Sequence, residues 1–279
     1  MRRVGAEARH AAQAAALLDV RGQADFEAGH LAGSGHLPRA QLLERRAELP
    51  PRDRAVLVVA DDPHQSFGAA ADLEAMGYSD VAWLDVPLDS LADGHTDRAP
   101  AVRLWRPAPF LTDVLPHIIA ATGARRGRAA DLAAGSGREA VFLALHSFEV
   151  EAWDRAPEAL ERATALAGRN RVAIRPVVAD LEQPDLALPV AHYQLVVVFR
   201  FLHRPLFPAI ERALAPGGWL VYETYRIGQE RYGRPRSRKF LLEPGELAAA
   251  FPGLAVVRYE EPEPAGGPVA ARLLARRVP

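Results

Sequence analysis

Short apolar runs alternate with longer amphipathic stretches in the first part of the chain. Runs at 17–20, 55–60 and 81–86 are typical of buried strands, and a helix is expected at 66–76, with Ser66 as its N-cap. Such alternation predicts a mostly parallel sheet flanked by helices. At 89–109 the alternation gives way to Asp, Gly, His, Thr, Pro and Arg, so we place a domain boundary there.

The remainder of the chain alternates more regularly. Strands are expected at 129–133, 149–153, 172–178, 193–199, 219–225, 254–260 and 269–276, and helices at 110–121, 139–146, 157–167, 206–214 and 245–251. The Pro- and Gly-rich turn 261–268 joins the last two strands into a hairpin. We therefore predict an α/β protein with two domains, 1–95 and 110–279, and a linker at 96–109.

Composition and charge narrow the function classes. The chain has 279 residues, of which 49% are hydrophobic and 25% charged, as in ordinary globular proteins. A net charge of −1 gives no electrostatic reason to expect a nucleic acid or a membrane as partner. No apolar run reaches a membrane-spanning length, and no signal-peptide core follows the two arginines at the start, so we expect a cytoplasmic location.

The sequence contains no cysteine. Disulfides, thiolate nucleophiles and cysteine-ligated zinc or iron–sulfur clusters are therefore excluded. Asp61, Asp62 and His64 share one loop, which we interpret as capping the next helix, and we expect no metal site.

The sharpest motif is the glycine-rich segment 131–140, DLAAGSGREA. It leaves a predicted strand, turns on Gly135 and Gly137, and enters a predicted helix. Glycines allow the backbone to approach a ligand closely, and a helix N-terminus attracts an anionic group. Because Gly135, Gly137 and Ala140 also satisfy the dinucleotide fingerprint, an NAD-dependent oxidoreductase is one alternative.

Three carboxylates help to choose between cofactor classes. Asp131 is a poor neighbour for a pyrophosphate but a good one for an ammonium group. Asp154 closes the next strand, where ribose hydroxyls bind in either class, and Asp180 follows the third, where an adenine amino group can be recognised. Together with the terminal hairpin, these positions favour an amino-acid–nucleoside cofactor over NAD.

Residues 104–279 resemble class I S-adenosylmethionine-dependent methyltransferases, and within that class the tellurite-resistance methyltransferase group. The matching segments are 131–142, 150–154, 179–181, 214–218, 240–247 and 274–276. The resemblance implies a Rossmann-like sheet of seven strands with the last one antiparallel, and S-adenosylmethionine lying over Gly135 and Gly137. The family more often has glycine at the position of Ala133.

The same resemblance assigns roles to individual residues. It implies that Asp131 faces the methionine amino group, Asp154 the ribose hydroxyls and Asp180 the adenine. The predicted cofactor-binding residues are Asp131, Ala133, Gly135, Gly137, Arg138, Asp154, Arg155, Asp180, Leu181 and Phe199.

Acceptor residues in such folds come from the carboxyl ends of the fourth and fifth strands and from a late loop. The candidate catalytic residues are Arg200, His203 and Tyr225, and the candidate substrate-binding residues are Arg204, Tyr232, Arg234 and Arg236. Because the loop 228–239 is strongly basic, we expect a small anionic acceptor such as a chalcogen oxyanion, a thiol or a carboxylate. No Asn-Pro-Pro-Tyr-like motif is present, which argues against methylation of a base or an amide nitrogen.

Residues 14–90 resemble the rhodanese fold. The matching segments are 18–21, 26–31, 55–59 and 77–78, together with Ser66. A working rhodanese ends its central strand with a cysteine, whereas this chain has Ala60 there. Pro63 lacks an N–H, and Asp61 and Asp62 repel anions, so we predict a catalytically inactive domain. Docking to a protein partner, homo-oligomerisation and shaping of the second domain's pocket remain open roles.

We therefore predict an S-adenosylmethionine-dependent methyltransferase acting on a small molecule. One alternative is the oxidoreductase that uses the same glycine turn. The other is a non-catalytic adaptor that binds the cofactor or a partner protein.

Overall fold

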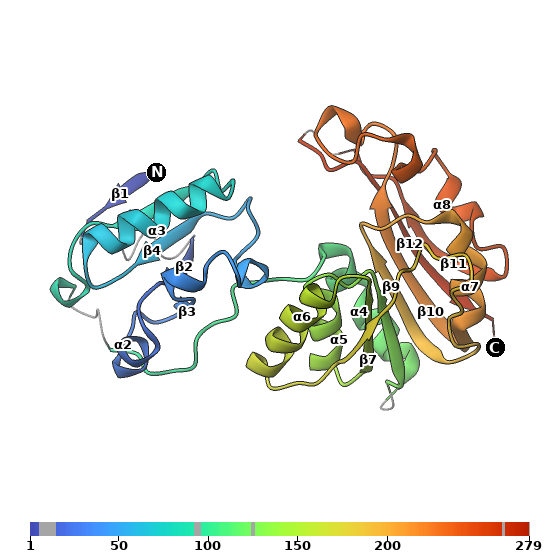
Figure 1. Cartoon of the computed structure of the whole chain (residues 1–279), viewed down its shortest axis with the longest axis horizontal. Helices are drawn as coiled ribbons and strands as arrows, with labels where there is room; N and C mark the ends of the chain where they lie inside the picture. Colours follow the sequence, from blue (N-terminus) through green and yellow to red (C-terminus); the bar gives the residue numbers. More distant parts are fainter. Residues whose placement is uncertain (6–14, 92–95, 124–125, 264–265, 279) are drawn as a thin grey trace. The chain divides into compact units, whose positions relative to one another are not determined.

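A computed structural model describes residues 1–5, 15–91, 96–123, 126–263 and 266–278. The chain divides into two units, 1–106 and 107–279 (Figure 1). Some predicted features lie outside the described residues. They are the segment 6–14 after the two arginines at the start, the predicted domain limit at 95, and residues 264–265 of the predicted turn. None of the helices in the described ranges combines the length and apolar character needed to span a bilayer.

The first unit contains a five-stranded parallel sheet in the order β1-β5-β4-β2-β3. Its strands are β1 (Arg2–Val4), β2 (Ala16–Asp19), β3 (Gly35–His36), β4 (Val56–Val59) and β5 (Val81–Leu84), and its helices are α2 (Gln23–Ala28), α3 (Pro63–Ala75) and the 3-10 turns η1 (Arg39–Gln41), η2 (Arg46–Glu48) and η3 (Leu88–Ser90). The central strand β4 is fully buried, as expected for a parallel strand. The predicted parallel sheet is thus confirmed.

Helix α3 begins three residues before the predicted N-cap Ser66. The side chain of Asp62 accepts a hydrogen bond from the His64 N–H at 2.9 Å, and Pro63 occupies the first helical turn. An aspartate cap followed by proline is a stronger start signal than the serine. Ser66 is instead buried inside the helix.

The second unit contains a seven-stranded sheet in the order β11-β12-β10-β9-β6-β7-β8. Its strands are β6 (Arg128–Leu132), β7 (Glu149–Asp154), β8 (Arg175–Val178), β9 (Tyr193–Phe199), β10 (Leu214–Tyr225), β11 (Leu254–Glu260) and β12 (Ala270–Arg277). The last strand, β12, runs antiparallel to both of its neighbours, and β6 to β10 are mutually parallel. The seven-stranded fold with an antiparallel last strand is therefore confirmed.

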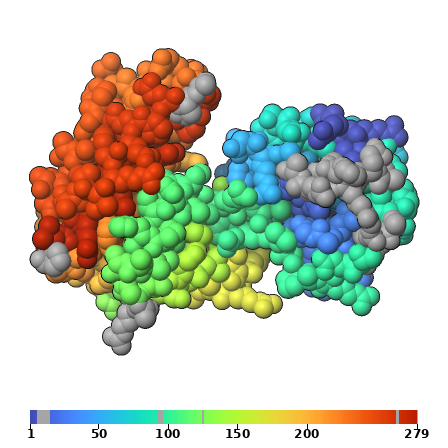
Figure 2. All heavy atoms as spheres, turned by 180° about the vertical axis from the view of Figure 1, so that it is seen from behind, coloured from blue at the N-terminus to red at the C-terminus, as the bar shows by residue number. Residues whose placement is uncertain are grey.

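Helices cover both faces of this sheet. They are α4 (Pro109–Thr122), α5 (Arg138–Leu145), α6 (Pro157–Arg169), α7 (Phe207–Ala213) and α8 (Glu246–Ala249), with 3-10 turns η4 (Arg204–Leu206), η5 (Gln229–Arg231) and η6 (Arg238–Phe240). Helices α4, α5 and α6 lie on one face, and α7 and α8 on the other (Figure 1). Seen from behind, the green residues of α4 lie against the orange-to-red C-terminal strands (Figure 2), where Asp113 pairs with Arg258 at 2.5 Å.

Three elements of the second unit differ most from the predicted ones. β8 begins at Arg175 instead of 172, and α8 is a single turn instead of the segment 245–251. β10 begins at Leu214, which was predicted as helical. Leu214 pairs with Tyr193 of β9, and the register shifts before pairing resumes at Trp219, so the strand passes through a bulge that hides its start in the sequence.

Candidate active site

The carboxyl ends of the parallel strands β6 to β10 meet at one edge of the sheet. The glycine-rich turn follows β6, Asp154 ends β7, Asp180 follows β8, Phe199 ends β9 and Tyr225 ends β10. The fold therefore brings the predicted cofactor and acceptor residues to the same edge.

The two glycines of the turn have different roles. Both have left-handed backbones, with φ +53° at Gly135 and +76° at Gly137. A Cβ on Gly137 would lie 2.5 Å from the Cβ of Ala163, so this glycine lets the start of α5 pack against α6. A Cβ on Gly135 would meet no protein atom within 4 Å, so this side of the turn is open to a ligand. Ala133 also has a left-handed backbone, with φ +61°.

Asp154 joins the glycine turn to the next helix. One carboxylate oxygen accepts a hydrogen bond from the Gly135 N–H at 2.8 Å, and the other accepts from the Ala156 N–H at 2.9 Å, just before α6. Each oxygen retains a further lone pair for a ligand hydroxyl. The helix-start role and the ribose-binding role are thus compatible.

Asp131 is buried and accepts a hydrogen bond from the Ala140 N–H at 2.9 Å. Burial raises the pKa of this carboxyl well above its usual range, and the negative charges of Glu139 and Asp154 raise it further. Glu139, absent from the predicted set, accepts a hydrogen bond from the Ala108 N–H at 3.0 Å. A nearby cation would favour the ionised form of Asp131.

Asp131, Glu139 and Asp154 have no basic ion-pair partner among the described residues. S-adenosylmethionine carries a sulfonium and an ammonium group. The open face of Gly135 and the surplus of carboxylates fit such a cationic ligand.

Asp180 lies in the turn after β8. It accepts hydrogen bonds from the Glu182 N–H at 3.0 Å and the Gln183 side-chain amide at 3.2 Å. The Glu182 N–H lowers the pKa of Asp180 most, and the Gln183 amide and the positive charges of Arg155 and His203 lower it further. Leu181 is buried beside this turn, and Arg138 is the first residue of α5.

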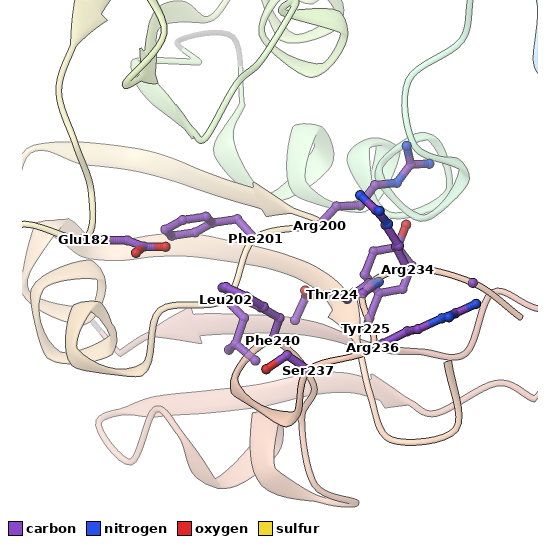
Figure 3. Close-up of a pocket in the computed structure, with 12 residues that line it drawn as sticks. Glu182, Arg200, Phe201, Leu202, Thr224, Tyr225, Arg234, Arg236, Ser237 and Phe240 are labelled. Carbon is purple, nitrogen blue, oxygen red and sulfur yellow. The ribbon is translucent and has the colours of Figure 1, made fainter. Parts of the chain in front are cut away.

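A pocket of about 840 Å³ opens at the carboxyl ends of β9 and β10 (Figure 3). Its lining residues come from the segment after β8, from both strand ends and from the late loop: Glu182, Arg200, Phe201, Leu202, Thr224, Tyr225, Gly233, Arg234, Pro235, Arg236, Ser237 and Phe240. Of the predicted acceptor residues, Arg200, Tyr225, Arg234 and Arg236 are among them.

The three arginines in the pocket have no ionic partner within the described part of the chain. Among the described residues, no carboxylate oxygen lies within 4.0 Å of the guanidinium nitrogens of Arg200, Arg234 or Arg236. Arg200 also has a left-handed backbone with φ +58°, and its N–H donates to the Glu223 carbonyl at 2.8 Å. Such strain is typically found at binding sites.

The remaining predicted acceptor residues do not line this pocket. Arg204 forms a two-pronged ion pair with Glu246, at 2.5 and 2.9 Å, and donates to the carbonyls of Lys239 and Leu241. Arg204 therefore holds the late loop in place. His203 precedes η4, and the half-exposed Tyr232 ring lies 6.0 Å from the guanidinium of Arg231.

Eight lining residues were not among the predicted site residues: Glu182, Phe201, Leu202, Thr224, Gly233, Pro235, Ser237 and Phe240. None of them belongs to a chemical motif. The available signals were the basic loop 228–239, which contains three of them, and the matched segment 240–247, which begins at Phe240. Sequence reasoning located the charged side of the pocket and missed its apolar side.

In the first unit, the position of the rhodanese cysteine is occupied by Ala60, which directly follows β4 and is fully buried. Arg21, also buried, pairs with Asp19 at 2.8 Å and with Asp61 at 3.0 Å. Asp61 and Asp62 are thus committed to an ion pair and a helix cap, and no group of three metal-ligating side chains occurs in the described residues.

Comparisons with known proteins address both units. Residues 5–87 match the family of the rhodanese-like domain, and residues 129–218 match a methyltransferase-domain family. An uncharacterized protein of Schizosaccharomyces pombe, UNK4.09, is 23% identical over 83% of each chain. The thiosulfate sulfurtransferase GlpE of Pseudomonas fluorescens is 36% identical over a segment that covers 26% of this chain and 66% of that protein.

Among solved structures, TehB from Haemophilus influenzae is 16% identical with a TM-score of 0.48, over 60% of this chain and 62% of that chain. The two family matches confirm the rhodanese-like and methyltransferase resemblances stated from the sequence, and the second implies S-adenosylmethionine as cofactor. The chain therefore carries a rhodanese-like domain followed by the domain of a methyltransferase.

Proposed function

We propose that the second domain transfers the methyl group of S-adenosylmethionine to a small anionic acceptor held in the pocket of Figure 3. The observation that carries this proposal is that Arg200, Arg234 and Arg236 line one pocket and form no ion pair with any described carboxylate. Arginines placed in this way favour a ligand with carboxylate-like or phosphate-like oxygens.

The cofactor lies along the glycine turn in this proposal. Asp131 and Glu139 attract its ammonium group, and Asp154 accepts hydrogen bonds from its ribose hydroxyls. Asp180, whose carboxylate is oriented by the Glu182 N–H, accepts a hydrogen bond from the adenine amino group in this proposal. When bound, S-adenosylmethionine supplies an electrophilic methyl group, whose bond to sulfur breaks as an acceptor lone pair forms the new bond, which leaves S-adenosylhomocysteine.

The chain's own residues bind and orient the acceptor. The arginines fix the anionic group, and the Tyr225 hydroxyl can donate a further hydrogen bond in the pocket. An acceptor that arrives deprotonated needs no general base, so placement and exclusion of water supply most of the catalysis. Phe201, Leu202 and Phe240 provide the apolar wall that excludes water.

The first test is calorimetric titration with S-adenosylmethionine, S-adenosylhomocysteine and NAD in parallel. We expect micromolar binding of the first two and none of NAD. Binding of NAD alone would indicate the oxidoreductase. Cofactor binding without turnover on thiols, chalcogen oxyanions or carboxylates would indicate an adaptor.

The acceptor site is tested by kinetics once an acceptor is found in this screen. Arg234→Ala is expected to lower kcat/KM by about tenfold or more, since it removes a charge-assisted contact. Arg238→Ala is the matched control, because Arg238 lies in the same loop, does not line the pocket and has a highly exposed side chain. Equal rates for the two variants would refute the role of the arginines.

A further inference from the structure

We infer that the acceptor is an organic acid with an aromatic or extended apolar body, and not a bare inorganic oxyanion; this inference rests on the proposed methyl transfer. The pocket is divided into a charged end and an apolar end, as Figure 3 shows. A ligand that satisfies both ends must carry an anionic group and apolar surface in one molecule.

The charged end contains Arg200, Arg234 and Arg236, with the Tyr225 hydroxyl beside them (Figure 3). Arg200 comes from the end of β9, whereas the other two arginines come from the late loop. Because their guanidinium groups lack ionic partners in the described structure, this end has a surplus of positive charge. It suits one carboxylate or a group of similar shape and charge.

The apolar end contains Phe201, Leu202 and Phe240 (Figure 3). Leu202 is buried, and Phe201 packs against the main core, so this wall is fixed by the fold. Phe240 is 38% exposed, which is high for a phenylalanine that adjoins a pocket. An apolar ligand body would remove this ring from water, with a gain that scales with the area covered.

Charge at the apolar end is balanced locally. Glu182, which also lines the pocket, pairs with Lys239 at 3.7 Å, and the Lys239 ammonium lies 5.2 Å from the Phe240 ring centroid. Glu182 therefore offsets Lys239 and leaves the surplus positive charge at the arginine end. The two ends thus differ in charge as well as in polarity.

Size gives a further criterion. The pocket volume of about 840 Å³ falls within the range of roughly 300–1,000 Å³ that is typical of sites for drug-sized organic ligands. A tetrahedral oxyanion would fill a small fraction of it and leave Phe201 and Phe240 in contact with water. A carboxylate attached to one or two rings contacts both ends.

The test measures binding directly and uses the full chain. The probes are three organic acids (benzoate, 2-naphthoate and octanoate), two small anions (acetate and sulfate), and naphthalen-2-ylmethylammonium as a charge-reversed analogue. Each is titrated calorimetrically into protein saturated with S-adenosylhomocysteine. At least one organic acid is expected to bind tenfold or more tightly than acetate and sulfate, and the ammonium analogue should not bind.

Two variants separate the contributions of the two ends. Arg234→Ala should lower the affinity for the best organic acid by about tenfold and should also lower the affinity for sulfate. Phe240→Ala should lower the affinity for the organic acid by about fivefold and leave the affinity for sulfate within twofold of wild type. The matched controls are Arg238→Ala in the same loop and Val257→Ala on β11, an exposed apolar residue outside the pocket.

The outcomes distinguish this inference from the proposed function. If S-adenosylhomocysteine does not bind, the methyltransferase proposal fails. If it binds but sulfate binds as tightly as every organic acid, or Phe240→Ala has no effect on them, the inference alone is overturned. Unchanged melting temperatures of the variants would show that they remain folded.

Discussion

The carboxylate of Asp154 and the backbone N–H of Gly135 are joined by a hydrogen bond of 2.8 Å. This bond connects the end of β7 to the glycine turn after β6, and it orients the side of Gly135 that has no protein neighbour. The residue predicted to hold the ribose therefore also shapes the turn over which we propose that the cofactor lies.

Asp154→Ala is expected to weaken binding of S-adenosylmethionine by ~1.5–3 kcal/mol, about 10- to 150-fold. The substitution removes the ribose ligand and releases the Gly135 N–H. Asp154→Asn keeps an oxygen for that N–H, so its loss of affinity should be smaller. Calorimetric titration of both variants measures the difference, and an unchanged dissociation constant for Asp154→Ala would refute the assignment.

Ala133→Gly is expected to stabilise the protein. A left-handed backbone is unfavourable for alanine by roughly 1–2 kcal/mol, and the greater freedom of glycine in the unfolded chain offsets part of the gain. We expect the free energy of unfolding to rise by about 0.5–1 kcal/mol.

The neighbouring substitution is the control for that measurement. Ala134 is buried and does not have a positive φ, so Ala134→Gly should lower the free energy of unfolding by about 0.5–1 kcal/mol. Both values come from urea denaturation of the cofactor-free protein. The same sign for both variants would show that the backbone of Ala133 is not strained.

Asp131→Asn is expected to have opposite effects on stability and on binding. Because burial raises the folded-state pKa of Asp131 above its unfolded value, the fold favours the protonated carboxyl, and stability falls as pH rises through the folded pKa. Asparagine stays neutral and keeps an oxygen for the Ala140 N–H. The variant should therefore unfold at a higher temperature than wild type at pH 8, and the difference should shrink towards pH 5.

Binding of the cofactor should reverse that order. Without the carboxylate, the ammonium group loses its partner, and affinity for S-adenosylmethionine should fall by about tenfold. Thermal unfolding with and without cofactor measures both effects. If Asp131→Asn is less stable than wild type at pH 8 without cofactor, the conclusion that burial disfavours the ionised form of Asp131 is wrong.

Hydrophobic periodicity predicted most of the fold because most of its strands are buried on both faces. The strand predicted at 193–199 has the same bounds as β9, and strands were also predicted for β6 and β10, which pair with it. β1 and β3 were missed, since strands of three and two residues are too short to show a period. Their pairing depends on contacts that are distant in sequence.

The two parts of the site differed in how far the sequence could predict them. The cofactor residues follow strand ends at regular intervals, so Asp131, Asp154 and Asp180 could be proposed one by one. The apolar wall is formed by Phe201, Leu202 and Phe240 from distant segments, and of these only Phe240 lies in a segment that matched the family. Arg204 was wrongly placed among the pocket residues, because its ion pair with Glu246 is formed only in the tertiary fold and cannot be read from the sequence.

The rhodanese-like domain is predicted to stay inactive even when its cysteine is restored. Ala60→Cys would place the thiol at a fully buried position, followed by Asp61 paired with Arg21 and by Pro63, which has no N–H. Thiocyanate formation from thiosulfate and cyanide should therefore remain at background, with GlpE of Pseudomonas fluorescens as positive control. Turnover by the variant would show that the loop can still bind a persulfide.

Under the proposed function, position 200 makes opposite demands on fold stability and on activity, because Arg200 has a left-handed backbone and lines the acceptor pocket. Glycine at this position would relieve the strain and remove a side chain of the pocket in the same step. A search for more thermostable variants is therefore expected to select Arg200→Gly, and a search for faster methylation to reject it. Engineering of this enzyme should hold position 200 fixed and seek stability elsewhere, for example at position 133, which also has a left-handed backbone.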